Sequence, residues 1–162
     1  RSIENMSTAR TGALIVVERE TALTDIGETG TVIDANITSS LIETIFYEGS
    51  PLHDGALIIR GEKIYTAGCV LPLTENKALS KALGTRHRAG IGITENSDAT
   101  VFIVSEETGI VSMAEDGKLD RFLDTKTVEK SLLNIYLNTQ AEGVTPSGIK
   151  GFLDKWKRRK NV

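Results

Sequence analysis

The chain has 162 residues, one cysteine and two histidines, with 40% hydrophobic and 25% charged residues. This size suits one compact domain with a sizeable core, and the composition is that of a soluble globular protein, not a disordered or fibrous one. The net charge of −3 argues against an electrostatic nucleic-acid binder, and the single cysteine excludes a disulfide scaffold or zinc ribbon and fits a reducing compartment. No apolar run approaches the roughly 18 residues that span a bilayer, and no signal peptide is visible.

In the first half of the chain, short runs of apolar, β-branched residues predict strands, and one stretch has helical spacing. The predicted elements are a buried strand at Gly12–Glu18, turns at Thr21–Gly30, a short strand at Gly30–Ile37, and a helix at Ser39–Phe46 that begins with a capping box of Ser40 and Glu43.

The second half predicts a hairpin, two more strands and three helices. The hairpin joins Ala56–Arg60 to Lys63–Leu71 through Gly61-Glu62, a two-residue link with glycine first, as a type II′ turn requires. The other elements are helices at Asn76–Leu83, Arg86–Thr94 and Thr127–Thr139, and strands at Thr100–Ser105 and Gly109–Asp116. Hairpins mixed with helices predict one α/β (α+β) domain in residues 1–140, with a mixed, largely antiparallel sheet flanked by helices. Residues 141–162 are predicted to be a flexible basic tail.

The stretch GTRHRAG places a basic triplet at the start of a predicted helix. With Thr85 as N-cap, Arg86, His87 and Arg88 lie in the first turn, where the helix dipole already contributes about half a positive charge. Cations there oppose helix stability, whereas an anion meets free N–H groups, two guanidinium groups and an imidazole. Phosphate is therefore the predicted ligand of this turn. The alternative is an exposed basic turn that aids solubility.

His53, Asp54 and Gly55 stand at the entrance of a strand whose apolar run needs neither a carboxylate nor an imidazole. The carboxylate can bind a divalent cation or accept a proton from a hydroxyl, the imidazole can bind a metal, and Gly55 lets a ligand approach the backbone. These ligands favour Mn²⁺ or Co²⁺ over Mg²⁺. The alternative is an Asp-Gly turn with a packed histidine. A metal phosphohydrolase of the HD type is excluded, because it needs another metal-binding histidine and His87 lies between two arginines.

Two further stretches allow either a binding or a structural role. Ser105 can bind a phosphate oxygen, and Glu106 or Glu107 can hold an arginine or a metal, or this turn is simply solvated. Leu71, followed by Pro72 and Leu73, is either part of the core or one wall of an adenine pocket.

Taken together, PLHDGA and GTRHRAGIG, with GALIVVE before them and VSEETG after, resemble the diadenylate cyclase (DisA N-terminal) domain. The resemblance covers roughly residues 8–138 and is greatest to the membrane-anchored, CdaA-type branch. It implies a mixed sheet flanked by helices and the conversion of two ATP into cyclic di-AMP and two pyrophosphates. It also implies the cytoplasmic domain of a bacterial membrane-anchored protein, whose transmembrane helices would precede Arg1.

The resemblance also implies a role for each matching residue. Asp54 would activate the ribose 3′-hydroxyl near a divalent metal, Mn²⁺ before Co²⁺ or Mg²⁺, and His53 would bind that metal. Gly55 and Ala56 would line the ribose, and Leu71 would contact adenine. The phosphates would be held by Thr85, Arg86, His87, Arg88 and Ser105, with Glu107 beside the metal and phosphates. The sequence departs from some relatives at Val70, where they carry an aromatic residue, and this weakens the case for adenine stacking.

Closing the ring of cyclic di-AMP requires two ATP molecules head to tail, and hence two copies of the site about a two-fold axis. The expected partners are therefore ATP and a second copy of the chain. The resemblance adds a YbbR-domain regulator and phosphoglucosamine mutase, with no nucleic acid. Two other hypotheses stand beside catalysis: a non-catalytic module that senses ATP or cyclic di-AMP, and an interaction scaffold that docks partners through its N-terminal segment and basic tail.

Overall fold

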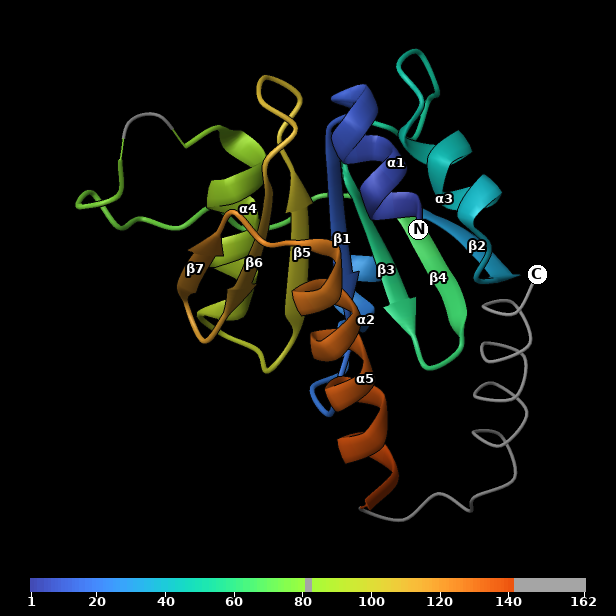
Figure 1. Cartoon of the computed structure of the whole chain (residues 1–162). Coiled ribbons are helices and arrows are strands. Elements are labelled where there is room, and N and C mark those ends of the chain that lie inside the picture. The colour runs from blue at the N-terminus through green and yellow to red at the C-terminus, as the bar shows by residue number, and fades with distance from the viewer. Residues whose placement is uncertain (81–82, 142–162) are drawn as a thin grey trace. The chain divides into compact units, whose positions relative to one another are not determined.

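The structure, a computed structural model, describes residues 1–80 and 83–141, with side chains described as far as residue 138 in the last helix (Figure 1). The predicted tail, from residue 142 onward, lies outside the described residues. The elements are α1 (Ser2–Ala9), β1 (Ala13–Val17), α2 (Thr24–Gly27), β2 (Thr31–Asn36), α3 (Ser39–Phe46), β3 (Ala56–Arg60), β4 (Lys63–Cys69), α4 (Thr85–Thr94), β5 (Thr100–Val104), β6 (Val111–Glu115), β7 (Lys118–Arg121) and α5 (Thr125–Ala141).

The strands form one sheet in the order β2-β4-β3-β1-β5-β6-β7. Only β1 and β3 pair in parallel, and every other neighbouring pair in this sheet is antiparallel. The predicted mixed, largely antiparallel sheet flanked by helices is confirmed. The predicted hairpin is also confirmed, because β3 and β4 are antiparallel and Gly61 has a φ of 57°, as the first position of a type II′ turn requires.

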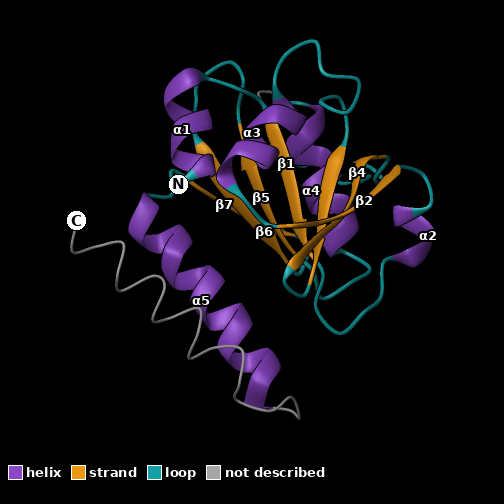
Figure 2. Cartoon of the chain, turned by 90° about the vertical axis from the view of Figure 1, so that its right-hand side faces the viewer, coloured by secondary structure: helices purple, strands orange, loops and turns teal. Residues whose placement is uncertain are grey.

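Helices cover the two faces of the central strands (Figure 2). On one face, Ala89, Ile91 and Ile93 of α4 share a core cluster with the alternate residues Leu14 and Val16 of β1. On the other face lie α1 and α3, which Asn5 and Glu43 join by a side-chain hydrogen bond of 2.9 Å. Because both faces are covered, all five residues of β1 and of β5 are buried, which explains the unbroken apolar runs in their sequences.

Three local predictions are wrong. Helix α3 is capped by Thr38, which accepts the Leu41 N–H, and not by a box of Ser40 and Glu43. The stretch predicted as turns contains the short helix α2. The predicted helix at 76–83 is absent from its described part, where residues 77–79 form a turn and a bend. Helix α1 and strand β7 were not predicted, because neither carries an apolar pattern strong enough to mark it.

The chain divides into two compact units, residues 1–125 and residues 126–162. The first unit holds the whole sheet with α1–α4, and the described part of the second is α5. The predicted division into a catalytic domain of residues 1–140 and a basic tail of residues 141–162 stays a prediction. Within the described part of the chain, no helix is both long enough and apolar enough to span a bilayer.

Candidate active site

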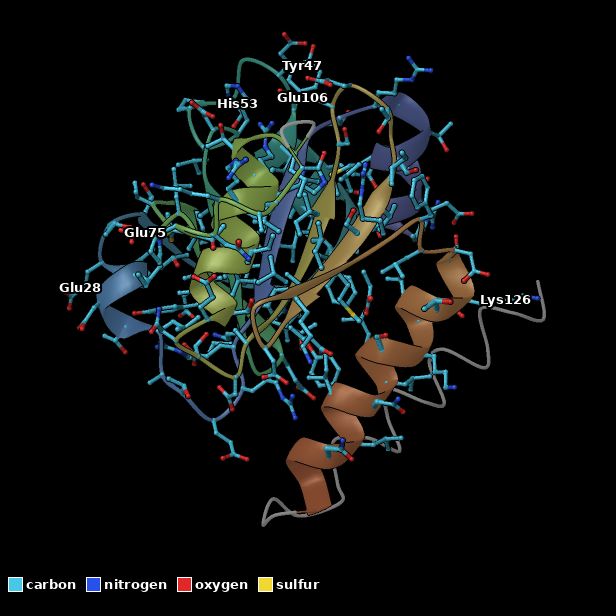
Figure 3. The ribbon with its side chains drawn as sticks, turned by 90° about the vertical axis from the view of Figure 1, so that its left-hand side faces the viewer. Glu28, Tyr47, His53, Glu75, Glu106 and Lys126 are labelled. Atoms are coloured by element: carbon cyan, nitrogen blue, oxygen red, sulfur yellow. The ribbon has the colours of Figure 1, made fainter. Side chains whose placement is uncertain are left out.

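The stretches with predicted chemistry gather at one end of the sheet. Ala13 at the start of β1 pairs with Val104 at the end of β5, so the turn after β5 lies beside the start of β1. Because β3 is parallel to β1, its entrance with His53 and Asp54 lies at the same end. In Figure 3, His53 and Glu106 both lie at this end of the molecule. The fold therefore brings together segments that are far apart in the sequence.

The loop before β3 orients His53 and leaves Asp54 exposed. His53 Nδ1 lies 2.6 Å from the carbonyl oxygen of Ser50, which can only accept a hydrogen bond. This contact requires a proton on Nδ1, and in the neutral imidazole with that tautomer Nε2 has the lone pair that can bind a metal. An exposed carboxylate next to an imidazole in this tautomer fits the predicted pair of metal ligands.

Gly55 has a structural task that the sequence did not reveal. A Cβ at this position would lie 2.6 Å from the carbonyl carbon and 2.7 Å from the Cα of Gly68. The backbone of β4 therefore lies directly against Gly55, next to the pairing of Ala56 with Cys69. The predicted approach of a ligand to Gly55 stays a prediction. Gly68 itself has a φ of 72°, in the region that favours glycine.

The basic turn lies at the start of α4, as predicted, but Thr85 is not its N-cap. Gly84 is the N-cap, and Thr85 is the first helical residue, exposed and without a capping hydrogen bond. The first turn contains no acidic residue of its own. The positive charge of this first turn is offset by a carboxylate from the turn after β5, where Glu106 Oε2 accepts a hydrogen bond from Arg86 Nη1. This ion pair brings the start of α4 to the same end of the sheet as Asp54.

His87 is buried and 5% exposed, unlike the two arginines beside it, which are half-buried. Burial lowers its pKa below the ordinary value, the charge of Arg121 lowers it further, and Glu107 partly offsets both. The imidazole is therefore neutral at pH 7, because a histidine with a lowered pKa loses its proton below that pH. The positive charge of the triplet therefore resides on Arg86 and Arg88, and His87 adds a buried, neutral imidazole.

Three other predicted site residues differ in the solvent exposure of their side chains. Ser105 is half-buried, and its Oγ accepts the N–H of Thr108, while Glu107 is exposed. Leu71 is 7% exposed and belongs to the core cluster beneath α4, and its contact with adenine stays a prediction. Its neighbours Val70 and Leu73 are 69% and 52% exposed and present apolar surface instead.

Two further residues complete this end of the sheet. The sequence named Glu106 as one of two carboxylates able to hold an arginine, which the ion pair with Arg86 confirms. Gly12 carried no signal beyond preceding a strand. A Cβ on Gly12 would lie 2.6 Å from Arg86 Nη1 and 2.8 Å from Glu106 Oε2. Gly12 therefore leaves the space in which the Arg86–Glu106 pair lies.

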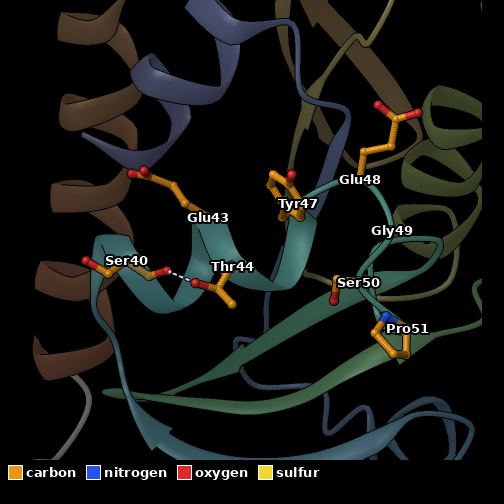
Figure 4. A pocket seen from close by; sticks show the side chains of 8 residues that line it. All are labelled: Ser40, Glu43, Thr44, Tyr47, Glu48, Gly49, Ser50 and Pro51. Carbon is orange, nitrogen blue, oxygen red and sulfur yellow. Dashed lines mark hydrogen bonds between the residues drawn. The ribbon is translucent and has the colours of Figure 1, made fainter.

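A surface pocket beside the end of α3 does not belong to this set (Figure 4). It is lined by Ser40, Glu43, Thr44, Tyr47, Glu48, Gly49, Ser50 and Pro51. The lining holds two carboxylates and no basic residue, so it suits a phosphate poorly.

A basic helix start and an exposed carboxylate at one end of a mixed α/β sheet suit the binding of a nucleotide and its phosphates. The family model described as DisA bacterial checkpoint controller nucleotide-binding matches residues 1–119. The chain belongs to this family.

Several relatives are named as cyclic di-AMP synthases or diadenylate cyclases. The chain is 46% identical over 132 residues to cyclic di-AMP synthase CdaA of Bacillus subtilis, covering 82% of the chain and 48% of the relative. It is 42% identical over 161 residues to a diadenylate cyclase of Listeria monocytogenes, covering 99% of the chain and 57% of the relative. The chain thus spans about half the length of the curated relatives it matches.

A solved structure supports the fold. A crystal structure of a double mutant of DacA from Staphylococcus aureus has a TM-score of 0.82 and 48% sequence identity, covering 83% of this chain and 90% of that one. A structure described as a hypothetical membrane spanning protein from Bacillus cereus has a TM-score of 0.73 and 46% identity, covering 76% of this chain and 60% of that one.

Proposed function

We propose that the chain is the catalytic domain of a diadenylate cyclase, which condenses two ATP into cyclic di-AMP and releases two pyrophosphates. The observation that carries the proposal is the presence of exposed Asp54 and of the basic turn of α4 at the same end of the sheet. The similarity of the chain to relatives named as a cyclic di-AMP synthase and a diadenylate cyclase supports the same reaction.

Asp54 is the base in this proposal. It accepts the proton of the ribose 3′-hydroxyl as that oxygen bonds to the α-phosphorus of the second ATP, and the bond from that phosphorus to the pyrophosphate oxygen breaks. Arg86 and Arg88, with the free N–H groups of the α4 turn and Ser105, hold the triphosphate and offset its charge. Arg86 exchanges Glu106 for phosphate when ATP binds, because both are anions that compete for one guanidinium group.

A divalent metal fits the same end of the sheet through His53 and Asp54. Within the described residues, no three His, Cys, Asp or Glu side chains are grouped as a metal site, so His53 and Asp54 would hold the ion together with oxygen atoms of the triphosphate or of water. Such an ion would neutralise phosphate charge and help to deprotonate the 3′-hydroxyl. A nitrogen ligand favours Mn²⁺ or Co²⁺ over Mg²⁺.

The test of this function is an incubation of the protein with ATP and Mn²⁺, with a metal-free control, and analysis of the products by chromatography and mass spectrometry. We expect cyclic di-AMP with pyrophosphate. Bound but unreacted ATP at all protein concentrations would instead favour a module that senses ATP or cyclic di-AMP without turnover.

The reaction requires a homodimer, since one site holds one ATP and each 3′-oxygen attacks the nucleotide of the other site. We expect the specific activity to fall in proportion to protein concentration once the chain is diluted below the dimer dissociation constant. Activity per mole that stays constant over this range, while analytical ultracentrifugation shows monomers, would contradict the dimer.

Gly12→Ala tests the part that Arg86 plays. The added methyl group displaces the ends of Arg86 and Glu106, not backbone, so the fold should remain and ATP affinity should fall by about 10-fold, the loss of one hydrogen bond to a charged group. Isothermal titration with a non-reactive ATP analogue measures this change. In the same background, Glu106→Ala removes one of the two crowded neighbours and should restore part of the affinity; unchanged binding by Gly12→Ala would contradict the role of Arg86.

We also propose that the chain is the cytoplasmic domain of a bacterial membrane-anchored protein. The similarity to CdaA and to a structure described as a membrane spanning protein supports this placement. A YbbR-domain regulator and phosphoglucosamine mutase stay predicted partners, on the resemblance alone.

A further inference from the structure

Three buried polar atoms beneath the basic turn have no hydrogen-bond partner among the described residues: His87 Nε2, Ser112 Oγ and Arg121 Nε. His87 is 5% exposed and Ser112 is 0% exposed. Buried polar atoms are nearly always bonded to protein or to an ordered water. Three such atoms on three different elements therefore call for a common explanation.

Strand register places Ser112 and Arg121 together. They are direct partners in the antiparallel pairing of β6 and β7, so their side chains share one face of the sheet. The next pair on that face is Ala114 and Leu119, and both pack in the core cluster beneath α4. Because side chains on a strand alternate between faces, Ser112 and Arg121 also face α4.

The orientation of α4 brings His87 to the same place. At the other end of the helix, Thr94 Oγ1 accepts the N–H of Gly117 in the turn between β6 and β7. The start of α4 therefore lies over the opposite end of the β6–β7 hairpin (Figure 1). The strand register places Ser112 and Arg121 at that end. The charge of Arg121 contributes to the lowered pKa of His87, as expected of two side chains that lie near each other.

The three atoms have complementary chemistry. Arg121 Nε–H can only donate, the Ser112 hydroxyl can donate and accept, and His87 Nε2 does either according to its tautomer. A buried water typically makes two to four hydrogen bonds to groups of this kind. We infer that one buried water joins His87, Ser112 and Arg121, and that this network fixes the imidazole and thereby aims Arg86 and Arg88 at the triphosphate. Ser112 and Arg121 are thus positioning residues, an assignment that rests on the proposed function.

The imidazole itself gives the first readout. The chain has two histidines, so a long-range ¹H–¹⁵N spectrum contains two imidazole patterns, and His53→Gln assigns them. We expect Ser112→Ala and Arg121→Lys, which keeps the charge but removes Nε, each to shift the His87 nitrogens, and the wild type to show magnetisation transfer from water to this ring. The control is Thr66→Val, which removes another 0% exposed hydroxyl, one that contacts Cys69 on β4, and should leave His87 unchanged.

The second readout is the affinity for a non-reactive ATP analogue. Ser112→Ala and Arg121→Lys should weaken it about 3- to 10-fold, the effect of one lost hydrogen bond. Thr66→Val should retain wild-type affinity even if its melting temperature falls. Unshifted His87 nitrogens, or wild-type affinity in both variants, would overturn the inference. If Ser112→Ala does not fold, Arg121→Lys and the wild-type water transfer decide. A wild type that makes no cyclic di-AMP would contradict only the proposed function, because spectra and affinity are read without turnover.

Discussion

Replacing Asp54 with asparagine should abolish cyclic di-AMP formation while ATP binding persists. Asparagine keeps the size of the side chain but cannot accept the 3′-hydroxyl proton, and loss of a general base typically lowers a rate about 10²- to 10⁴-fold. Asp54 is exposed, so the exchange should not destabilise the fold. Product formation with Mn²⁺ and titration with a non-reactive ATP analogue, made on the same preparation, separate turnover from binding.

The matched control for Asp54→Asn is Asp25→Asn, an exposed aspartate in the first turn of α2. This variant should retain wild-type turnover. If Asp54→Asn also retained it, another group would have to be the base. If Asp54→Asn lost ATP binding together with turnover, the metal contact of this carboxylate would be its main task.

Replacing Gly55 with alanine should destabilise the domain by about 2–3 kcal/mol, in the range of overpacked sites. The new Cβ would lie within 3.0 Å of three backbone atoms of Gly68 and Cys69, and backbone cannot move aside as a flexible side chain does. Strands β3 and β4 would separate where the Asp54 loop begins, so activity should fall together with stability. Urea unfolding followed by circular dichroism measures the change.

Gly84→Ala is the control for this substitution, since a Cβ there meets nothing within 4 Å. It should cost about 1 kcal/mol or less, the effect of a changed N-cap. A Gly55→Ala protein with wild-type stability but weakened ATP binding would contradict this explanation. It would show that position 55 requires glycine so that the nucleotide can approach, as the family resemblance implies, and not because of the contact with Gly68.

Most of the fold could be predicted from sequence where burial is the dominant force. The runs around Leu14 and Phe102 are apolar without interruption because both faces of their strands are covered, and such runs mark strands without knowledge of their partners. Strand β7 and helix α1 could not be predicted, because each buries few residues and owes its place to its neighbours. The N-caps are Thr38 and Gly84, where the sequence pattern had predicted Ser40 and Thr85.

The candidate site divides in the same way. The sequence by itself determined its chemistry: a histidine and a carboxylate at a strand entrance, and two arginines at a helix start, are visible because they break the local rules of stability. Only the tertiary structure decided which groups meet. It pairs Arg86 with Glu106 beside Gly12, sets Gly55 against Gly68, and buries the side chains of His87 and Leu71. These contacts join residues far apart in the chain, and their geometry follows from strand register and helix placement, which local sequence patterns do not encode.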